Sequence, residues 1–260
     1  MQGTQAAAHR LARLLFILIL GCGLGGRVLA QNAVEPDPRD PFEGFNRAMF
    51  SFNDTLDQYL LRPVAVVYDK ATPDPMQDGI GNFFNNLGEI PTIFNDLMQF
   101  KLGQAGLDTT RFLVNTTVGL FGFIDIGSRI GLTRNNEDFG QTLGYWGLDS
   151  GPYLVLPLLG PSTIRDATGM VPDYYVSPNR AVDHDTTRYS LRALDLVDTR
   201  ASLLEAEKLV AGDRYAFFRN AYLQRREFLV NDGQMADDFL DDDDLFDDFD
   251  DTDMESESGG

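Results

Sequence analysis

The sequence predicts a mainly α-helical protein with a single folded domain, on three observations. Apolar residues recur at three- and four-residue steps in several segments, which is the spacing of one helix face. Hydrophobic residues make up 43% and charged residues 23% of the chain, ordinary usage for a folded protein. No internal repeat is visible, so the 260 residues indicate one domain, over residues 40–233, with flanking segments.

The first predicted helix begins after residue 40. Asp40 is suited to cap it, Pro41 to occupy its first position, and Glu43 lies three residues after the cap. Pro63 should end this helix, because a residue that precedes proline is disfavoured in the helical conformation. Its apolar stripe consists of Phe45, Met49, Phe52, Leu56 and Tyr59.

Two more helices are predicted before residue 115. An apolar stripe from Ile80 to Leu87 forms one helix, which Pro91 should break before a new segment at residues 93–98. Residues 107–114 form a third, short helix that carries Arg111.

Residues 115–165 are rich in glycine and lack a clear period. Their apolar runs, at residues 120–124 and 153–159, are too short to cross a bilayer as helices. Buried loops, a hairpin and segments that enter lipid all stay open, and close backbone packing in a core is favoured.

The last third is predicted to be helical again. Breaks are expected at Asp198 and at Gly212, and Asp213 should cap the final helix. One side of that helix is apolar: Phe217, Phe218, Ala221, Tyr222 and Leu229. Its arginines are Arg214, Arg219, Arg225 and Arg226. They predict a solvated face paired with local acids, with attraction to anionic lipid as the alternative.

The net charge of −19 is unevenly distributed. Residues 1–30 contain three arginines and no acid, whereas residues 231–260 contain 14 acids and no Lys or Arg. So acidic a chain lacks the basic footprint of a nucleic-acid binder. The tail, residues 234–260, is expected to be disordered and to act as a solubiliser or, through Phe239, Phe246 and Phe249, as a docking segment for a basic partner.

The chain offers little catalytic or metal-binding chemistry. It has two histidines, His9 and His184, and one cysteine, and it contains neither a Gly-x-Ser-x-Gly elbow nor a phosphate-binding loop. Zinc sites need more ligands than this, and His184 between two aspartates is expected to be a solvated loop residue. We therefore predict no enzymatic activity, no cofactor and no metal.

Residues 1–30 resemble an export signal. Arg10 and Arg13 precede an apolar run, residues 14–20, that is too short to span a bilayer. Two cleavage sites compete. Cleavage before Cys22, within a sequence like a lipobox, would make this cysteine a lipid attachment site, and cleavage after Ala30 would leave no anchor. Residues 31–39 are then a linker.

Several short motifs occur in order between residues 40 and 233. They include Asp40-Pro41-Phe42-Glu43-Gly44-Phe45-Asn46-Arg47, Arg62-Pro63-Val64-Ala65, Arg111-Phe112-Leu113-Val114-Asn115-Thr116, Phe139-Gly140-Gln141-Thr142-Leu143-Gly144, Thr199-Arg200-Ala201 and Asp213-Arg214-Tyr215. Together these motifs resemble the MlaA (VacJ) family of outer-membrane lipoproteins. Each motif is weak alone, but the series is specific.

The resemblance implies a ring of amphipathic helices around a channel, lying in the inner leaflet of the outer membrane on its periplasmic side. Such a protein associates with trimeric porins, removes misplaced phospholipids from the outer leaflet and passes them to a periplasmic lipid carrier of the MlaC type. The alternative function is a scaffolding lipoprotein that supports porins. The unusual phenylalanine content, 19 residues, is consistent with membrane seating.

The resemblance also suggests roles for particular residues. The glycine-rich stretch Phe139–Pro157 corresponds to a mobile hairpin near the channel. Its channel and hairpin residues are Gly144, Gly147, Gly151, Leu154 and Leu156. The three glycines are expected to be its conformationally permissive positions, with Gly147 as the hinge to test. The residues expected to face the membrane are Phe45, Met49, Phe52, Phe83, Phe121 and Phe123.

Overall fold

The computed structural model describes residues 37–208, 210 and 212–234. The chain divides into two units, residues 1–37 and 38–260, and the second is described here by itself. Within its described residues, this unit is mainly helical with one small antiparallel sheet, which confirms the predicted fold class. The predicted signal segment, Cys22 and the acidic tail with Phe239, Phe246 and Phe249 lie outside the described residues.

The first helical stretch continues through the position at which we expected it to end. Helix α2 (Glu43–Leu56) leads into a π-helical segment, η1 (Asp57–Leu61), and then into α3 (Arg62–Ala71). The amide of Arg62 donates to the carbonyl of Asp57 five residues earlier, and Pro63 occupies the first turn of α3, where its missing N–H costs little. The predicted stop at Pro63 is therefore wrong.

Asp40 does not cap α2 as predicted. The helix begins after Phe42 without a side-chain cap. The Asp40 carboxylate is instead buried, where it accepts hydrogen bonds from Asn46 at 2.7 Å, from Arg219 at 3.2 Å and from the Tyr215 hydroxyl. These partners fix the start of the unit against its last helix.

Helix α4 (Asp74–Met98) contains Pro91 without ending there, so the predicted break is wrong. Tertiary contacts hold both sides of the proline: Glu89 accepts from Arg111 of α5 (Leu102–Thr117), and Asn95 donates to Asp173 of α8 (Ile164–Val176). Such contacts routinely override a local helix preference. Helix α5 is also longer than predicted, and it packs along α4.

The glycine-rich region contains short elements. Helices α6 (Ile126–Arg129) and α7 (Phe139–Tyr145) precede the hairpin of β1 (Tyr153–Leu156) and β2 (Gly160–Thr163), in which Tyr153 pairs with Thr163. The glycine-rich stretch thus begins with the helix α7, and the β-hairpin follows it.

The remaining elements are α8 (Ile164–Val176), the 3-10 segment η2 (Pro178–Ala181), α9 (Asp185–Ser202), α10 (Leu204–Glu207) and α11 (Arg214–Val230). Helix α9 continues through Asp198, where we predicted a break. Asp213 caps α11 as predicted, because its side chain accepts from the amides of Tyr215 and Ala216.

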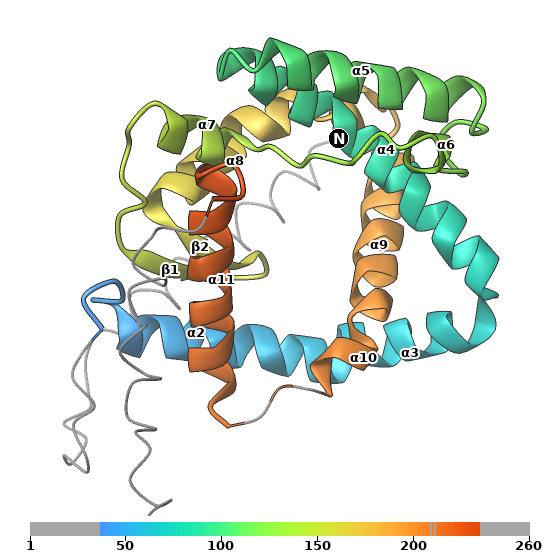
Figure 1. Ribbon diagram of the computed structural model, residues 1–260. Helices are drawn as coiled ribbons and strands as arrows, with labels where there is room; N and C mark the ends of the chain where they lie inside the picture. Colours follow the sequence, from blue (N-terminus) through green and yellow to red (C-terminus); the bar gives the residue numbers. More distant parts are fainter. Residues whose placement is uncertain (1–36, 209, 211, 235–260) are drawn as a thin grey trace, which may run out of the picture. The chain divides into compact units, whose positions relative to one another are not determined.

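The helices of this unit run around a frame (Figure 1). Helices α2 and α3 form one side, α4 and α5 continue around it, and α9 and α11 stand as two uprights. Helix α9 packs on α3 and α4, and α11 packs on α7 and β2. No helix in the described part of the chain is long and apolar enough to cross a membrane.

Candidate functional site

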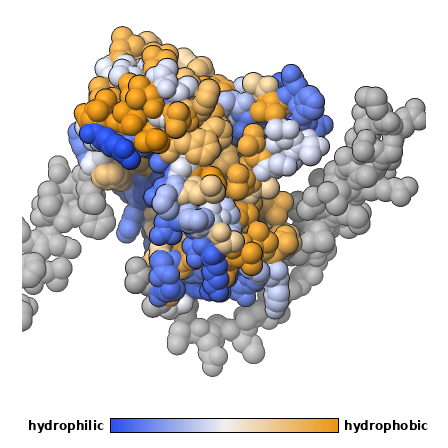
Figure 2. Space-filling model, turned by 90° about the vertical axis from the view of Figure 1, so that its right-hand side faces the viewer, coloured by the Kyte–Doolittle hydropathy of each residue, from blue (hydrophilic) through white to orange (hydrophobic). Residues whose placement is uncertain are grey.

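Burial in this unit is inverted relative to an ordinary soluble domain. Among the described residues, 19 buried side chains are polar or charged and only seven are hydrophobic. The hydrophobic cluster is small: Met49, Tyr153, Val155 and Tyr215, with Phe50, Tyr222 and Leu223 packed against it. Large apolar side chains are exposed instead, and in Figure 2 hydrophobic residues gather over much of the visible face. Apolar surface this extensive indicates a face that contacts a membrane or another protein.

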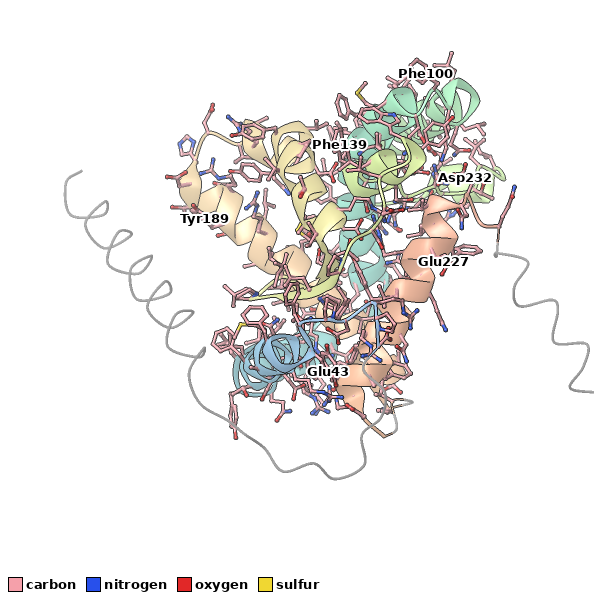
Figure 3. The ribbon with its side chains drawn as sticks, turned by 90° about the vertical axis from the view of Figure 1, so that its left-hand side faces the viewer. Glu43, Phe100, Phe139, Tyr189, Glu227 and Asp232 are labelled. Atoms are coloured by element: carbon pink, nitrogen blue, oxygen red, sulfur yellow. The ribbon has the colours of Figure 1, made fainter. Side chains whose placement is uncertain are left out.

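The exposed apolar residues lie on several elements. Phe100, at the turn between α4 and α5, is 79% exposed and lies at the opposite edge of the unit from Glu43 (Figure 3). Of the residues predicted to face the membrane, Phe45, Phe52, Phe121 and Phe123 are exposed and Phe83 is half-buried. The expectation is wrong for Met49, which packs in the small hydrophobic cluster.

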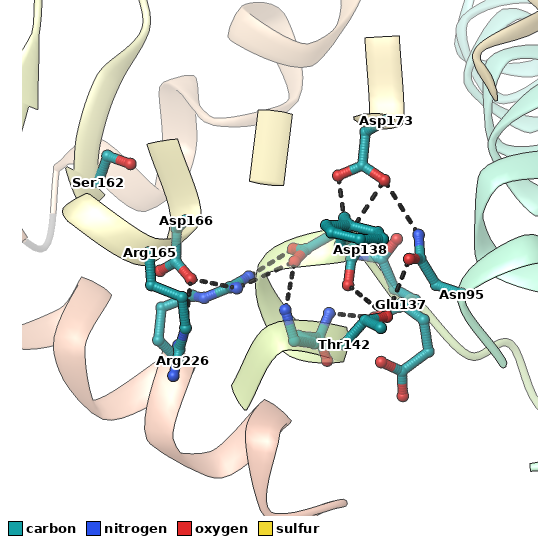
Figure 4. Close-up of polar contacts among 12 residues, drawn as sticks. Asn95, Glu137, Asp138, Thr142, Ser162, Arg165, Asp166, Asp173 and Arg226 are labelled. Atoms are coloured by element: carbon teal, nitrogen blue, oxygen red, sulfur yellow. Dashed lines mark hydrogen bonds and ion pairs between the residues drawn. The ribbon is translucent and has the colours of Figure 1, made fainter. Parts of the chain in front are cut away.

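One buried polar network centres on Arg226 of α11 (Figure 4). Its guanidinium donates to Asp166 at 2.8 Å and to both oxygens of Asp138. Burial alone would raise the pKa of the Asp138 carboxyl, but the hydrogen bonds and charge of Arg226 outweigh this effect and lower it. Asp166 also accepts from Arg165 at 3.0 Å and from the Tyr222 hydroxyl at 2.8 Å. The ion pairs of Arg226 with Asp138 and Asp166 thereby connect α11 to the start of α7 and to α8.

A second buried network joins α4 to α5 and α6. Arg111 is 2% exposed and donates to Glu89 at 3.3 Å and to Asp125 at 3.2 Å. Burial raises the pKa of Glu89 to about 6, although Arg111 opposes the shift. Because polar contacts such as these hold the helices together, apolar side chains are available for the outer surface.

A cavity of about 510 Å³ lies between α2, the hairpin, the end of α9, α10 and α11. Most of its wall is apolar: Phe50, Val155, Pro161, Leu203, Ala206, Val210, Phe217 and Phe218. Gly160, Asn53 and the charged residues Asp54, Asp57, Arg200, Glu207 and Arg214 complete the lining. A cavity with both an apolar wall and charged groups suits an amphipathic ligand.

The charged part of the lining is organised around Glu207. Its carboxylate accepts from Arg200 at 2.6 Å and from Arg214 at 3.0 Å, and Arg62 lies 3.8 Å away. Burial opposes ionisation of Glu207, but Arg200 and the other two arginines lower its pKa, so the carboxylate is charged at neutral pH. Arg200 also binds Asp57 through two hydrogen bonds, of 2.7 and 2.8 Å.

The predicted hairpin residues have different surroundings. Gly147 and Gly151 have φ values of +91° and +66°, which favour glycine. Gly144 has no positive φ; a Cβ there would lie 2.8 Å from Val230 and 2.9 Å from Arg165, so this glycine permits close packing. We predicted Gly144 to be a conformationally permissive position, and that reason is wrong.

Leu154 and Leu156 lie in the hairpin, but they do not line the cavity described above. Residues 153 and 155 are buried, whereas Leu154 and Leu156 point to the opposite face of β1. Val155, and not Leu154 or Leu156, lines the cavity. The hairpin strand β1 therefore contributes Val155 to the cavity wall, and the side chains of Leu154 and Leu156 lie on the other face of that strand.

Two of the four arginines of α11, Arg219 and Arg226, differ from the prediction, whereas Arg225 is exposed and Arg214 binds Glu207 seven residues earlier. Arg219 and Arg226 are not on a solvated face with local acids; they bind Asp40 and the pair Asp138 and Asp166, which lie between 60 and 179 residues away along the sequence. Glu227, one of the acids close to these arginines in sequence, is exposed on the outer side of α11 (Figure 3). Arg219, Tyr222 and Arg226 follow one another at three- and four-residue spacing, so they share one helix face. This shared face was the sequence signal that the two arginines could point inward with Tyr222.

The described residues contain no group of three or more His, Cys, Asp or Glu side chains that could hold a metal ion. His184 is exposed at the start of α9, as predicted. The lining of the cavity offers an apolar wall together with two guanidinium groups and three carboxylates.

Comparison with known proteins gives consistent matches. The model of the family "MlaA lipoprotein" matches residues 38–229. The chain is 36% identical over 226 residues to the intermembrane phospholipid transport system lipoprotein MlaA of Escherichia coli (strain K12), covering 84% of this chain and 86% of that protein. Its identity to the protein of the same name from Haemophilus influenzae is 37% over 203 residues, covering 76% and 81% of the two chains.

A solved structure gives the same result. It comes from work on the structural basis for maintenance of bacterial outer membrane lipid asymmetry, and it superposes with a TM-score of 0.66 at 36% identity. The match covers 74% of this chain and 99% of the other. On sequence and fold together, the chain belongs to the MlaA lipoprotein family.

Proposed function

We propose that this protein moves phospholipids from the outer leaflet of the outer membrane to a periplasmic lipid carrier of the MlaC type, which maintains the lipid asymmetry of that membrane. The observation that carries the proposal is the cavity of about 510 Å³, with its apolar wall and its charged cluster around Glu207. The names of the relatives, which are lipoproteins of an intermembrane phospholipid transport system, support the choice of ligand.

The chemistry of a phospholipid matches this combination of surfaces. Its charged headgroup is costly to place in an apolar environment without polar partners, whereas its acyl chains favour apolar contacts. The cavity supplies both types of group, and the exposed apolar residues around the frame supply contact with a bilayer. The protein then lies at the periplasmic side of the outer membrane, associated with a trimeric porin and anchored through Cys22 if cleavage occurs before that residue.

Cells that lack the protein test this proposal against the scaffolding alternative. The proposal predicts that phospholipid accumulates in the outer leaflet while porin abundance is unchanged. Lipid accumulation is measured by modification of surface-exposed headgroups, and porin abundance by immunoblotting. Reduced porin abundance with a normal outer leaflet would contradict transport and favour the scaffold.

The mature N-terminus and the acidic tail are tested separately. Intact-mass measurement separates a diacylated Cys22 from a free N-terminus after Ala30. Deletion of residues 236–260, with binding to the carrier measured at two salt concentrations, tests the docking role of Phe239, Phe246 and Phe249. Unchanged affinity would end that role.

A further inference from the structure

A second pocket adjoins the cavity of the proposed function. Its volume is about 320 Å³, and its lining consists of Arg62, Leu204, Glu207, Lys208, Val210 and Arg214. The two share Glu207, Val210 and Arg214, so the second pocket opens beside the apolar wall. Three of its four charged lining residues are cations, which favours an anionic ligand.

Several donors in this pocket are only weakly engaged. Arg62 is half exposed, and among the described residues its ion pair is to Glu207 at 3.8 Å, beyond hydrogen-bond distance. Lys208 pairs with Glu205 on the surface, where both side chains are more than two-thirds exposed and such a pair contributes little stability. The Nε atom of Arg214 is buried and has no hydrogen-bond partner among the residues that the structure describes. A buried donor of this kind has a free-energy cost that a bound anion would remove.

Glu207 shows that the guanidinium groups already converge on one anionic group. Its carboxylate lies within 4 Å of nitrogen atoms from Arg62, Arg200 and Arg214. Carboxylate and phosphate oxygens have similar geometry toward guanidinium donors, so the same arginines are suited to a phosphate group. Arg200 is additionally held by Asp57 and Arg214 by Asp54 at 3.2 Å, so among the described residues Arg62 is the arginine of this cluster whose ion pair is to Glu207 alone.

The π-helical segment η1 lies beside this cluster. It begins at Asp57, the partner of Arg200, and ends immediately before Arg62. Segments of this type occur often at functional sites because they widen a helix and change the direction of its side chains. This π-helical segment therefore connects Asp57 to Arg62, which both belong to the charged cluster.

We propose that Arg62, Lys208 and Arg214 bind the phosphate group of a diacyl phospholipid, whose first acyl carbons contact the adjacent apolar wall, and that Glu207 is the internal anion that this phosphate displaces. The inference rests on the proposed function and names the part of the lipid that the site recognises. We therefore expect opposite effects of substitution: Glu207 competes with the phosphate for the cations, whereas Arg62 and Arg214 bind the phosphate.

The experiment compares two lipids that share acyl chains. The full-length mature protein in detergent is titrated with fluorescent phosphatidylglycerol and with diacylglycerol, which lacks the phosphate, and with inorganic phosphate as competitor. The variants are Arg62→Gln and Glu207→Gln. Arg225→Gln is the matched control, because Arg225 is an exposed arginine on α11 that lines neither pocket.

We expect the wild-type protein to prefer the phospholipid over diacylglycerol roughly tenfold or more, as a charge-assisted phosphate contact implies. Arg62→Gln should lose most of that preference and retain diacylglycerol affinity, whereas Glu207→Gln should bind phospholipid more tightly. Arg225→Gln should behave as wild type. Because Arg62 is half exposed and has only a long contact, its substitution should leave the fold intact, which circular dichroism checks.

Three results would overturn the inference. The first is equal binding of the two lipids by the wild-type protein, which leaves lipid transport possible but removes the phosphate site. The second is an unchanged preference in Arg62→Gln. The third is competition by inorganic phosphate without any preference between the lipids, which assigns the pocket to free phosphate. Failure to bind either lipid would instead contradict the proposed function itself.

Discussion

Replacement of Arg226 by methionine tests whether buried charge holds this frame together. Methionine keeps most of the side-chain volume and removes the positive charge. The arginine and Asp166 are 10% and 5% exposed, and removal of one partner from a buried ion pair costs about 3–5 kcal/mol. Asp166 keeps Arg165 and Tyr222 as partners, and Asp138 is 38% exposed, so we expect the lower end of that range.

A loss of about 3 kcal/mol lowers the melting temperature of a domain of this size by roughly 6–12 °C. The measurement is thermal unfolding in detergent, followed by circular dichroism. Arg225→Met is the matched control, because Arg225 is the exposed neighbour on the same helix. The reasoning is refuted if Arg226→Met shifts the midpoint no more than the control does.

The same pair of proteins has a predicted pH dependence. Arg226 lowers the pKa of Asp138 in the folded protein, so this interaction stabilises the fold above the unfolded pKa of about 3.9 and is lost as pH falls through the lower folded value. The difference between wild type and Arg226→Met should therefore shrink as the pH falls below about 3.9. A constant difference would show that the lost stability comes from packing and not from charge.

Three other substitutions have distinct expected results. Gly147→Leu introduces a side chain at a φ of +91° with no atom within 4 Å of its Cβ, and we expect impaired clearance of outer-leaflet phospholipid by a folded protein; normal clearance would contradict a hinge role. Gly144→Val places a Cβ 2.8 Å from Val230 and should destabilise the protein by about 1–3 kcal/mol, measured by denaturant unfolding; a neutral effect would contradict close packing. Asp213→Ala removes the cap of α11 and should cost about 1 kcal/mol in the same assay, and Asp213→Asn should restore most of it.

The sequence predicted the helices well because their apolar stripes have a clear period. The predicted ends were less accurate. Pro63, Pro91 and Asp198 all interrupt a local pattern, yet the helices continue through each of them. Proline in a helix costs about 3 kcal/mol, and contacts on both sides of Pro91 offset a cost of that size. Such contacts are formed by distant residues and have no local signal.

The sequence could not show which apolar residues face outward. Phe45, Met49 and Phe52 belong to one stripe of α2, but Met49 packs inside while the two phenylalanines are exposed. A lipid bilayer and a protein interior both favour apolar groups, so periodicity alone does not separate them. The fold decides which residue of the stripe packs against the hairpin, and in this structure that residue is Met49.

The charged part of the site was equally hidden. Arg200 and Asp57 are 143 residues apart in sequence, and Arg214 meets Glu207 across the end of α10. Arginine and acid content is visible in the sequence, but the choice of partner depends on the fold. The strand residue at the cavity, Val155, lies between Leu154 and Leu156, the two hairpin residues that we named from the sequence, and in a strand one position reverses the face.

The central claim is that the cavity between α2, the hairpin and α11 holds phospholipid. The most direct measurement is the amount of phospholipid that stays bound after purification in mild detergent, quantified by mass spectrometry per protein molecule. Ala206→Trp fills the cavity, and Ala221→Trp places the same ring on an exposed part of α11 outside its lining. Wild type and Ala221→Trp should retain phospholipid and Ala206→Trp should lose most of it, whereas equal retention by all three proteins would contradict the claim.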